Sequence, residues 1–210
     1  MNETSTSLLL ASGGLDSTTL AYWLLDKGVS FVPLFINYGQ HCAGTEYETL
    51  MSVMPPATRD RVCTVNMADV YRGTSSRLID EPDLWKDNME GDPLYLPYRN
   101  LLLLSVGAAF AQSRGYDALY AAFINSNHAK EIDCSAQFFA RLGGMLADYG
   151  TVRVEMPFRD LSKAEVAKIG VALNVPIAAT FSCQAASKIP CGACPNCVDR
   201  LNALKQLEQP

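Results

Sequence analysis

Two groups of residues near opposite ends of the chain combine the types and the spacing that chemistry needs. The first group spans residues 12–18 and reads Ser-Gly-Gly-Leu-Asp-Ser-Thr, directly after the apolar run 8–11. Two consecutive glycines let a backbone approach a ligand closely, and a helix that begins there points its free N–H groups at an anion. An ordinary Gly-Gly turn is the alternative. We predict a phosphate-binding loop, without the Gly-Lys-Ser/Thr ending of a Walker A motif, formed by Ser12, Gly13, Gly14, Leu15, Asp16, Ser17 and Thr18.

The second group consists of four cysteines near the C-terminus with the spacing Cys-x7-Cys-x2-Cys-x2-Cys. Thiolates two residues apart can bind one ion through a tight loop, and four of them satisfy the tetrahedral preference of zinc. The alternatives are unrelated thiols, a redox pair, which needs two cysteines only, or an iron–sulfur cluster. With four protein ligands the ion has no open coordination position, so it would stabilise the C-terminal segment and take no part in catalysis. We predict a structural Zn²⁺ site formed by Cys183, Cys191, Cys194 and Cys197.

A few further residues are candidates for the site. Asp16 is placed to help hold Mg²⁺, although a carboxylate in a first helical turn is also a common cap. Lys163, at a predicted helix start, would compensate phosphate charge unless it is merely solvated. Arg99 and Asn100 are expected to line the nucleotide side, with helix capping as the alternative. The predicted catalytic residues are therefore Asp16, Ser17 and Lys163.

Three cysteines lie outside that second group. Cys42 is unassigned, and Cys63 falls in a predicted strand and is expected in the core. Cys134 follows Asp133, the predicted N-cap of a helix, where a lowered pKa would make a thiol reactive. We favour packing over reactivity for Cys134.

The elements that position these residues follow a strand–helix alternation. The strand at 8–11 leads through the Gly-Gly turn into a helix at 15–27, which Gly28 ends, and a second strand follows at 31–36. This order predicts a right-handed parallel crossover and an α/β fold, a Rossmann-like parallel sheet with flanking helices. We divide the chain into an α/β domain at 1–180, which carries the phosphate loop, and a zinc-binding segment with a helix at 181–210. Further strands are predicted at 61–65, 118–124 and 151–156, and further helices at 97–114, 133–149 and 162–173, the last opened by a Ser-x-x-Glu capping box.

Composition narrows the function classes. The chain has 210 residues, 49% hydrophobic and 19% charged, with a net charge of −5, which argues against broad binding to nucleic acid or anionic membranes. No basic region precedes the first apolar run, and the apolar stretch 101–111 is too short to span a bilayer, so we predict a cytoplasmic protein. Seven cysteines in that compartment indicate metal binding or catalysis. The acidic stretch 80–92 is interpreted as a solvated loop, with a mobile lid as the alternative.

Residues 12–17 resemble the PP-loop of ATP pyrophosphatases, which hold the phosphates of ATP and cleave between the α- and β-phosphates. Other motifs follow in chain order: Tyr-Gly-Gln at 38–40, Pro-Tyr-Arg-Asn at 97–100, Asp-Cys at 133–134, Leu-Ser-Lys-Ala-Glu at 161–165, and the four cysteines followed by Arg200. Over nearly the whole chain this set resembles the QueC family, the 7-cyano-7-deazaguanine synthases of queuosine biosynthesis.

The resemblance implies an ATP-dependent ligase that converts 7-carboxy-7-deazaguanine and ammonia into 7-cyano-7-deazaguanine through adenylated intermediates. A carboxylate is a poor electrophile because its leaving group would be an oxide, and AMP transfer supplies a good leaving group. The resemblance also implies ATP, Mg²⁺ and Zn²⁺ as bound groups and a homodimer as the assembly.

The departures from the family lie in one segment. Where the family usually reads Asp-x-Ser-Gly-Tyr-Pro-Asp-Cys-Arg, residues 127–135 read Asn-His-Ala-Lys-Glu-Ile-Asp-Cys-Ser. A carboxylate suits the adjacent N–H donors of a guanine-like ring, and Asn127 is a weaker, mixed partner. After Tyr-Gly-Gln the family's usual Arg-His is replaced by His41 and Cys42. Neither His41 nor the other histidine, His128, is assigned as a general base.

Three rival functions remain open. A paralogue with a remodelled pocket would join an activated carboxylate to a different amine, including one on a protein. Sulfur transfer to tRNA also occurs among PP-loop enzymes, but the acidic charge and the lack of an RNA-binding extension count against it. A zinc-containing binding module would need a basic or aromatic surface near the cysteines, where the chain offers only Lys188, Arg200 and Lys205.

Overall fold

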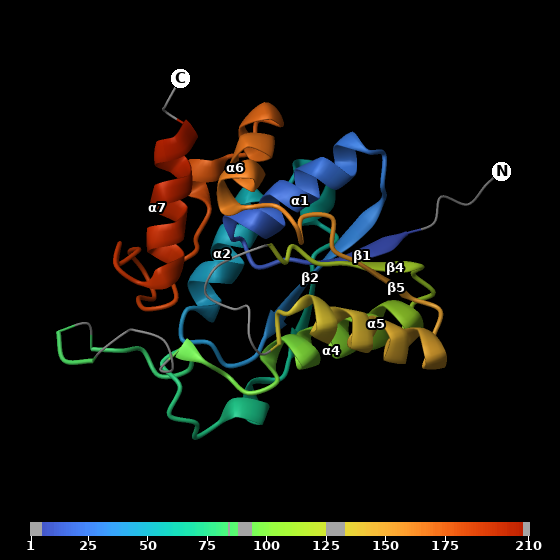
Figure 1. The fold of residues 1–210 in the computed structure, drawn as a ribbon, viewed down its shortest axis with the longest axis horizontal. Helices are drawn as coiled ribbons and strands as arrows, with labels where there is room; N and C mark the ends of the chain where they lie inside the picture. The colour runs from blue at the N-terminus through green and yellow to red at the C-terminus, as the bar shows by residue number, and fades with distance from the viewer. Residues whose placement is uncertain (1–5, 84, 88–93, 125–132, 208–210) are drawn as a thin grey trace.

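The computed structural model describes residues 6–83, 85–87, 94–124 and 133–207. Within them, the chain forms a parallel sheet with the strand order β3-β2-β1-β4-β5 (Figure 1). The predicted Rossmann-like α/β fold is therefore confirmed. The strands are β1 (Ser7–Leu10), β2 (Phe31–Asn37), β3 (Cys63–Asn66), β4 (Ala118–Tyr120) and β5 (Arg153–Glu155).

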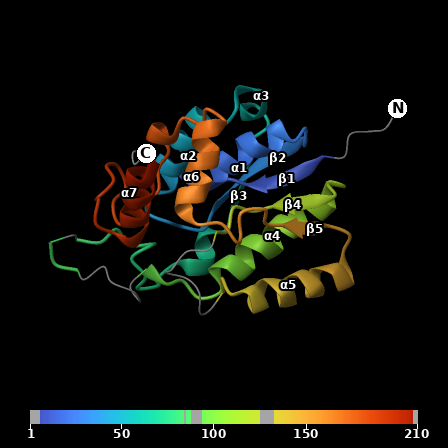
Figure 2. The ribbon, with the colours of Figure 1, turned by 45° about the horizontal axis from the view of Figure 1, so that its top comes forward.

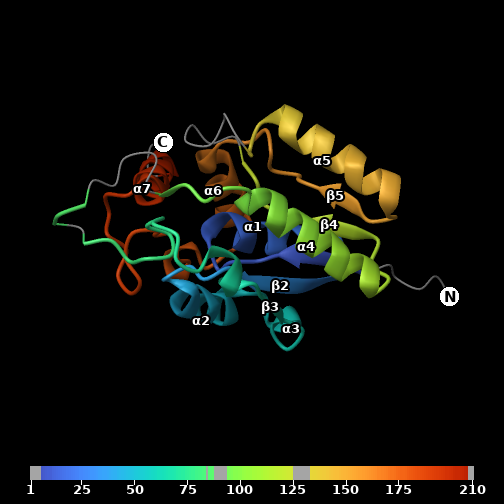
Figure 3. The ribbon, with the colours of Figure 1, turned by 90° about the horizontal axis from the view of Figure 1, so that it is seen from below.

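Helices cover both faces of this sheet. Figure 1 shows α4 and α5 on one face and α1 and α6 on the other, and the views in Figures 2 and 3 agree. Helix α7 lies beside α6, with which it is in contact. The helices are α1 (Leu15–Asp26), α2 (Ala43–Val53), α3 (Pro56–Arg59), α4 (Arg99–Ser113), α5 (Ala136–Tyr149), α6 (Lys163–Ala172) and α7 (Pro195–Leu207), with short 3₁₀ turns η1 (Ala68–Tyr71) and η3 (Ile177–Ala179).

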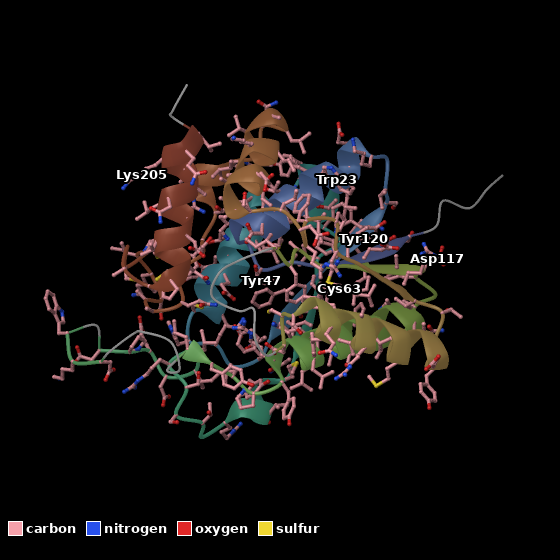
Figure 4. The ribbon with its side chains drawn as sticks, in the orientation of Figure 1. Trp23, Tyr47, Cys63, Asp117, Tyr120 and Lys205 are labelled. Carbon is pink, nitrogen blue, oxygen red and sulfur yellow. The ribbon has the colours of Figure 1, made fainter. Side chains whose placement is uncertain are left out.

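Alternation along β1 divides the core into two layers. Leu8 belongs to the cluster that contains Leu104 of α4, whereas its neighbour Leu9 belongs to the cluster that contains Leu20 of α1. Successive side chains of a strand point to opposite faces, so one short strand anchors helices on both sides. On α2, Tyr47 packs its ring against Phe35 of the sheet at a centroid distance of 5.5 Å (Figure 4).

Local signals placed most element boundaries to within a few residues. Gly28 has a φ of +71° just after α1, as expected for a glycine that ends a helix. Ser162 and Glu165 form the predicted capping box at the start of α6. No described helix has the length and apolar character that crossing a membrane requires. The division into domains at residue 180 stays a prediction.

Three expectations about elements were wrong or incomplete. The strand predicted at 118–124 ends at Tyr120. Helix α5 begins at Ala136 and is capped by Ser135, whose side chain accepts a hydrogen bond from the Phe138 N–H, and not by Asp133. Helix α2 had no counterpart in the sequence-based prediction. Its N-cap residue, Cys42, makes no side-chain capping bond, so no start signal marks it.

The strand order reverses direction between β1 and β4. From β1 the chain proceeds outward to β2 and β3, whereas β4 and β5 extend the sheet on the other side of β1. Loops at the carboxyl ends of β1 and β4 therefore diverge and leave a crevice, which is where open α/β sheets bind ligands. This topology directs attention to the loop after β1.

Candidate active site

A cavity of about 1250 Å³ opens at this crevice. This volume lies above the ~300–1,000 Å³ of a typical small-molecule pocket, so it has room for more than one ligand. Of the residues predicted from the sequence, the cavity lining includes Ser12, Gly14, Leu15, Asp16, Ser17, Arg99, Asn100 and Lys163. Residues that are far apart in the sequence are thus brought to one site.

Two predicted phosphate-loop residues do not line the cavity. The Thr18 side chain is fully buried in α1. Gly13 has a φ of +74° and faces α2, and its carbonyl oxygen accepts a hydrogen bond from the Phe181 N–H at 3.1 Å. Gly13 therefore shapes the loop from behind, and a direct phosphate contact by Thr18 stays a prediction that the lining does not support.

Hydroxyl groups brace the turn between β1 and α1. The Ser12 N–H donates to Ser17 Oγ at 3.3 Å, and Ser17 Oγ donates to the Gly14 carbonyl oxygen at 3.3 Å. The Ser12 hydroxyl lies 3.3 Å from that of Ser17 and accepts a hydrogen bond from the Gly14 N–H at 3.4 Å. Long, weak hydrogen bonds of this kind are readily exchanged for contacts to an anion. The loop therefore offers both backbone and hydroxyl donors.

Replacing Gly13 by alanine is expected to destabilise the protein by about 3 kcal/mol, because a non-glycine residue at positive φ costs about 1–2 kcal/mol and the Cβ adds a clash. That Cβ would lie 2.7 Å from the Glu46 carbonyl oxygen and 2.7 Å from the Leu50 nitrogen. Gly28→Ala is the matched control, since its φ is also positive and a Cβ there meets nothing within 4 Å. Thermal unfolding of both variants measures the difference, and equal melting temperatures would contradict this packing.

Asp16 and Lys163 form an ion pair across the cavity. Lys163 Nζ donates to Asp16 Oδ2 at 2.5 Å, and the side chains are 17% and 21% exposed, respectively. The other carboxylate oxygen, Oδ1, is buried and has no hydrogen-bond partner among the described residues. A carboxylate oxygen without a donor suits a hard cation such as Mg²⁺, which binds oxygen ligands. The residues present therefore fit the predicted role of Asp16.

Arg99 and Asn100 begin α4 at the opposite side of the cavity. The Asn100 N–H donates to Asp133 Oδ2 at 3.0 Å, and its side-chain amide donates to Asp133 Oδ1 at 3.2 Å. Asp133 therefore supports the start of α4 rather than of α5. The same Asn100 amide lies 2.8 Å from the sulfur of Cys134. Asn100 is thus chiefly occupied in joining α4 to residues 133–134, while Arg99 remains a candidate ligand group.

Cys134 is not an activated thiol. Burial raises the pKa of Cys134 to about 11, with a further rise from Asp133, while Arg99 and Asn100 oppose the change. A raised pKa leaves about a thousandth of the thiol ionised at pH 8. This direction disfavours the thiolate, so packing is favoured over reactivity for Cys134.

We expect Cys134 to react with iodoacetamide at pH 8 more than about tenfold slower than a cysteine in an unstructured peptide. The smaller thiolate fraction outweighs the greater nucleophilicity of a high-pKa thiolate. Peptide mass spectrometry of timed samples measures the rate at this cysteine. Labelling as fast as in the peptide would show that its pKa is not raised.

A group that sequence reasoning missed lines the cavity beside β2. Glu46, Gln40 and Tyr38 all face the cavity, and Gln40 is almost fully buried. The Gln40 side-chain amide donates to Glu46 Oε2 at 2.9 Å, and Gln40 Oε1 accepts from the Tyr38 N–H at 2.9 Å. Burial raises the pKa of Glu46, and also that of Tyr38. The Tyr-Gly-Gln motif was the available signal for Gln40, but nothing marked Glu46 because α2 was not predicted.

The four C-terminal cysteines meet at one point. Their sulfur atoms all lie within 4.8 Å of one another, close to the separation of about 3.8 Å that Zn–S bonds of about 2.3 Å impose on a tetrahedron. Backbone N–H groups point at the sulfurs, as a thiolate requires: Cys194 N–H lies 3.2 Å from Cys191 Sγ, and Cys191 N–H lies 3.4 Å from Cys183 Sγ. The set fits a tetrahedral metal ion of the zinc type.

The cysteine segment is docked against the start of α2. His41 Nδ1 lies 2.9 Å from Ser187 Oγ, and His41 Nε2 lies 3.1 Å from the Gln184 carbonyl oxygen. The Ser187 N–H donates to Glu81 Oε1 at 2.7 Å. Cys42 is buried in the same cluster as the four C-terminal cysteines, although it stands far from them in the sequence. The other histidine, His128, and the divergent residues 127–132 lie outside the described residues.

This segment also forms one wall of the cavity. Phe181, Ser182 and Gln184, and Asn196 and Asp199 of α7, line it. Arg200 holds α7 in place because its guanidinium donates to Thr180 Oγ1 and to the Ile177 carbonyl oxygen, both at 2.5 Å. A metal ion bound by the cysteines would therefore stabilise the wall that faces the phosphate loop.

The described part of the acidic stretch takes no part in the cavity. Asp83 pairs with Lys86 at 2.7 Å, and Asp87 pairs with Arg77 at 3.0 Å. None of these residues lines the cavity, and the segment extends away from the sheet in Figure 1. The interpretation of residues 80–92 as a solvated loop, with a lid as the alternative, stays a prediction.

Comparisons with known proteins agree with this geometry. Residues 6–208 match the model of the family described as "Queuosine biosynthesis protein QueC". The 7-cyano-7-deazaguanine synthase of Methanospirillum hungatei is 33% identical over 96% of this chain and 95% of that protein. The corresponding synthase of Haloarcula marismortui is 30% identical over 99% and 93%, respectively.

Solved structures with the same fold are more distant in sequence. A 4-thiouridine synthetase in complex with RNA and ATP is 15% identical, with a TM-score of 0.54 over 97% of this chain and 51% of that protein. A predicted tRNA methyltransferase subunit from Methanocaldococcus jannaschii has a TM-score of 0.53 at 15% identity, over 80% and 74%, respectively. The family match over almost all residues, together with the relatives above, shows that this chain belongs to the QueC family.

Proposed function

We propose that this chain converts 7-carboxy-7-deazaguanine and ammonia into 7-cyano-7-deazaguanine in three steps, of which the first and the third each consume one ATP. The observation that carries the proposal is a phosphate loop and a lysine facing one large cavity in a chain that matches the QueC model over residues 6–208. Its relatives are named for this product. Cytoplasmic location and a homodimeric state stay predictions.

The first step is activation of the carboxylate. A carboxylate oxygen of the substrate attacks the α-phosphorus of ATP, and the bond from that phosphorus to the pyrophosphate oxygen breaks. Backbone N–H groups of the loop, with the hydroxyls of Ser12 and Ser17, hold the phosphates, and Lys163 places positive charge beside the departing pyrophosphate. Asp16 keeps the Lys163 ammonium in position. Mg²⁺, when bound, would add charge neutralisation at the phosphates, with Asp16 as its protein ligand.

The second and third steps build the nitrile. Neutral ammonia attacks the acyl carbon and loses one proton, AMP departs with one oxygen of the original carboxylate, and an amide remains. The amide oxygen then attacks the α-phosphorus of a second ATP, pyrophosphate leaves, and loss of AMP and of the nitrogen-bound protons gives the C≡N bond. The cavity must exclude water during these steps because water would hydrolyse the adenylate. Four thiolate ligands leave no open position on the zinc, so we give it no part in the chemistry.

Oxygen labelling tests the adenylate. A substrate with ¹⁸O in both carboxylate oxygens is expected to yield two molecules of AMP, one from each adenylation. Each of them should carry one ¹⁸O atom. Phosphorus NMR or mass spectrometry of the recovered nucleotide measures the label. Label in inorganic phosphate, with ADP as the nucleotide product, would show phosphorylation and contradict adenylation.

A second candidate function has one specific observation in its favour. Ser135 stands where the family usually has arginine, and here its side chain lines the cavity and caps α5. The cation that the family places there is absent from this chain, so an adenylating ligase with another carboxylate or another amine stays a candidate. ATP consumption with alternative amines, in the absence of nitrile formation, would favour it.

A further inference from the structure

Glu46 is a half-buried acidic group of the cavity that the steps above do not use. It belongs to α2 but lines the cavity beside the end of β2, where Ile36, Tyr38 and Gln40 also contribute. Its main-chain oxygen lies 2.7 Å from the position that a Cβ on Gly13 would take, so Glu46 is directly behind the phosphate loop. The Glu46 side chain and the loop residues Ser12 and Ser17 line the same cavity, so one ligand in that cavity can contact both.

The carboxylate of Glu46 is held in a fixed orientation. Gln40 donates to its Oε2 at 2.9 Å, and the Gln40 amide also lies 3.4 Å from the Ile36 carbonyl oxygen. Gln40 Oε1 is taken by the Tyr38 N–H, so this buried amide cannot rotate without losing contacts on both sides. Glu46 has no ion pair within the described residues, and a carboxylate can accept more hydrogen bonds than Gln40 and the Cys42 thiol supply.

A carboxylate that lines a ligand cavity and is half-buried there loses part of its hydration, so a ligand donor would stabilise it. Burial raises the pKa of Glu46, and Gln40, Cys42 and Arg99 oppose this rise without an ion pair to offset it. Groups with this combination of burial and a specific donor partner are frequent in ligand sites. The Gln40 amide occupies one oxygen edge only, so acceptor capacity remains for a ligand N–H group.

Resting on the proposed function, we infer that Glu46 accepts a hydrogen bond from the exocyclic amino group of a purine-type ring in the cavity, and so selects that ring. Two rings of this chemistry enter the reaction. ATP carries the 6-amino group of adenine, and the acid carries the 2-amino group of its deazaguanine. Both present an N–H edge that a carboxylate recognises.

Ligands that lack one amino group test this inference and identify the ring. Purine riboside triphosphate replaces ATP in one arm, and the carboxy-deazapurine without its 2-amino group replaces the acid in the other. Dissociation constants are measured by calorimetry for the wild-type chain, for Glu46→Met, which has no acceptor oxygen, and for Glu46→Gln, which keeps one. The matched control is Glu48→Gln, an exposed glutamate on the same helix.

The wild-type chain is expected to bind one analogue at least about tenfold more weakly than its parent ligand, because the acceptor is left without a donor. Glu46→Met should reduce that discrimination to less than about threefold, Glu46→Gln should restore part of it, and Glu48→Gln should retain it fully. If Glu46→Met no longer discriminates between ATP and purine riboside triphosphate, the ring that Glu46 contacts is adenine. If it no longer discriminates between the acid and the acid without its 2-amino group, the ring is the deazaguanine. Equal binding of parent and analogue by the wild-type chain in both arms, or unchanged discrimination in Glu46→Met, would overturn the inference.

A failure of the inference about Glu46 can be distinguished from a failure of the proposed function. If the wild-type chain binds and discriminates ATP but binds no acid, the proposed substrate is wrong and Glu46 remains the acceptor. If the chain makes the nitrile but ignores both amino groups, the reaction stands and the role of Glu46 is rejected. Should Glu46→Met not fold, Glu46→Gln carries the test, because discrimination in that variant equal to that of the wild-type chain would overturn the inference, as would equal binding of parent and analogue by the wild-type chain.

Discussion

Asp16→Asn is expected to lower nitrile formation at least about a hundredfold while the melting temperature changes by only a few degrees. The substitution removes the charge that holds the Lys163 ammonium at 2.5 Å and the anionic oxygen that is buried without a partner. Losing one preorganised electrostatic group of this kind typically costs about 10²–10³ in rate. Steady-state kinetics with ATP, the acid and ammonia measures the effect, and thermal unfolding checks the fold.

A matched control separates catalysis from helix stability. Asp26 lies on the same helix α1 and pairs with Lys27 at the exposed end, so Asp26→Asn removes the same charge away from the cavity. It should retain activity within about twofold, because exposed ion pairs contribute little. Ser17→Ala should resemble Asp16→Asn in activity. Near-normal turnover in both Asp16→Asn and Ser17→Ala would contradict the assignment of residues 12–18 as a phosphate loop.

Cys194→Ala is expected to lose the bound metal, solubility and thermal stability together. The Cys194 sulfur is buried in the four-thiolate cluster, and structural zinc sites in small domains contribute about 10–16 kcal/mol of apparent binding energy. Even a fraction of that energy corresponds to a fall in melting temperature of about 10 °C or more for a chain of this size. Metal analysis and calorimetry on the same preparation measure both quantities.

The cysteine prediction also extends to the active site. The segment that a bound metal would hold supplies Phe181, whose N–H donates to the Gly13 carbonyl oxygen, and the α7 residues that line the cavity. ATP binding should therefore weaken along with metal content. Cys63→Ala is the control, since Cys63 lies in β3, half-buried and outside the cluster (Figure 4). A metal-free Cys194→Ala protein with full stability and unchanged ATP affinity would contradict a structural role.

The parts of the site that could be predicted are those encoded by neighbouring residues. The Gly-Gly turn requires a positive φ at Gly13, and the cysteine spacing requires only short loops, so each signal is complete within a few residues. The same holds for the capping box of α6. The geometry of such motifs depends on a few neighbouring residues and not on contacts with distant parts of the chain.

The parts that could not be predicted depend on tertiary contacts. Asp133 and Ser135 are both good N-cap residues, and the choice between them was made by Asn100, whose N–H groups take the Asp133 carboxylate for α4. Helix α2 lacks a capping side chain, and it is held instead by packing against Gly13 and the sheet. Because α2 was missed, Glu46 was missed with it.

The central claim is that one cavity joins ammonia to the carboxyl carbon and dehydrates the product with ATP. The most direct measurement is mass spectrometry of the deazapurine product after incubation with ATP, the carboxylic acid and ¹⁵N-labelled ammonia. We expect the nitrile with one ¹⁵N atom, formed only when ATP is present and strongly reduced in Asp16→Asn. ATP consumption that depends on the acid but leaves no labelled nitrile or amide would contradict the account.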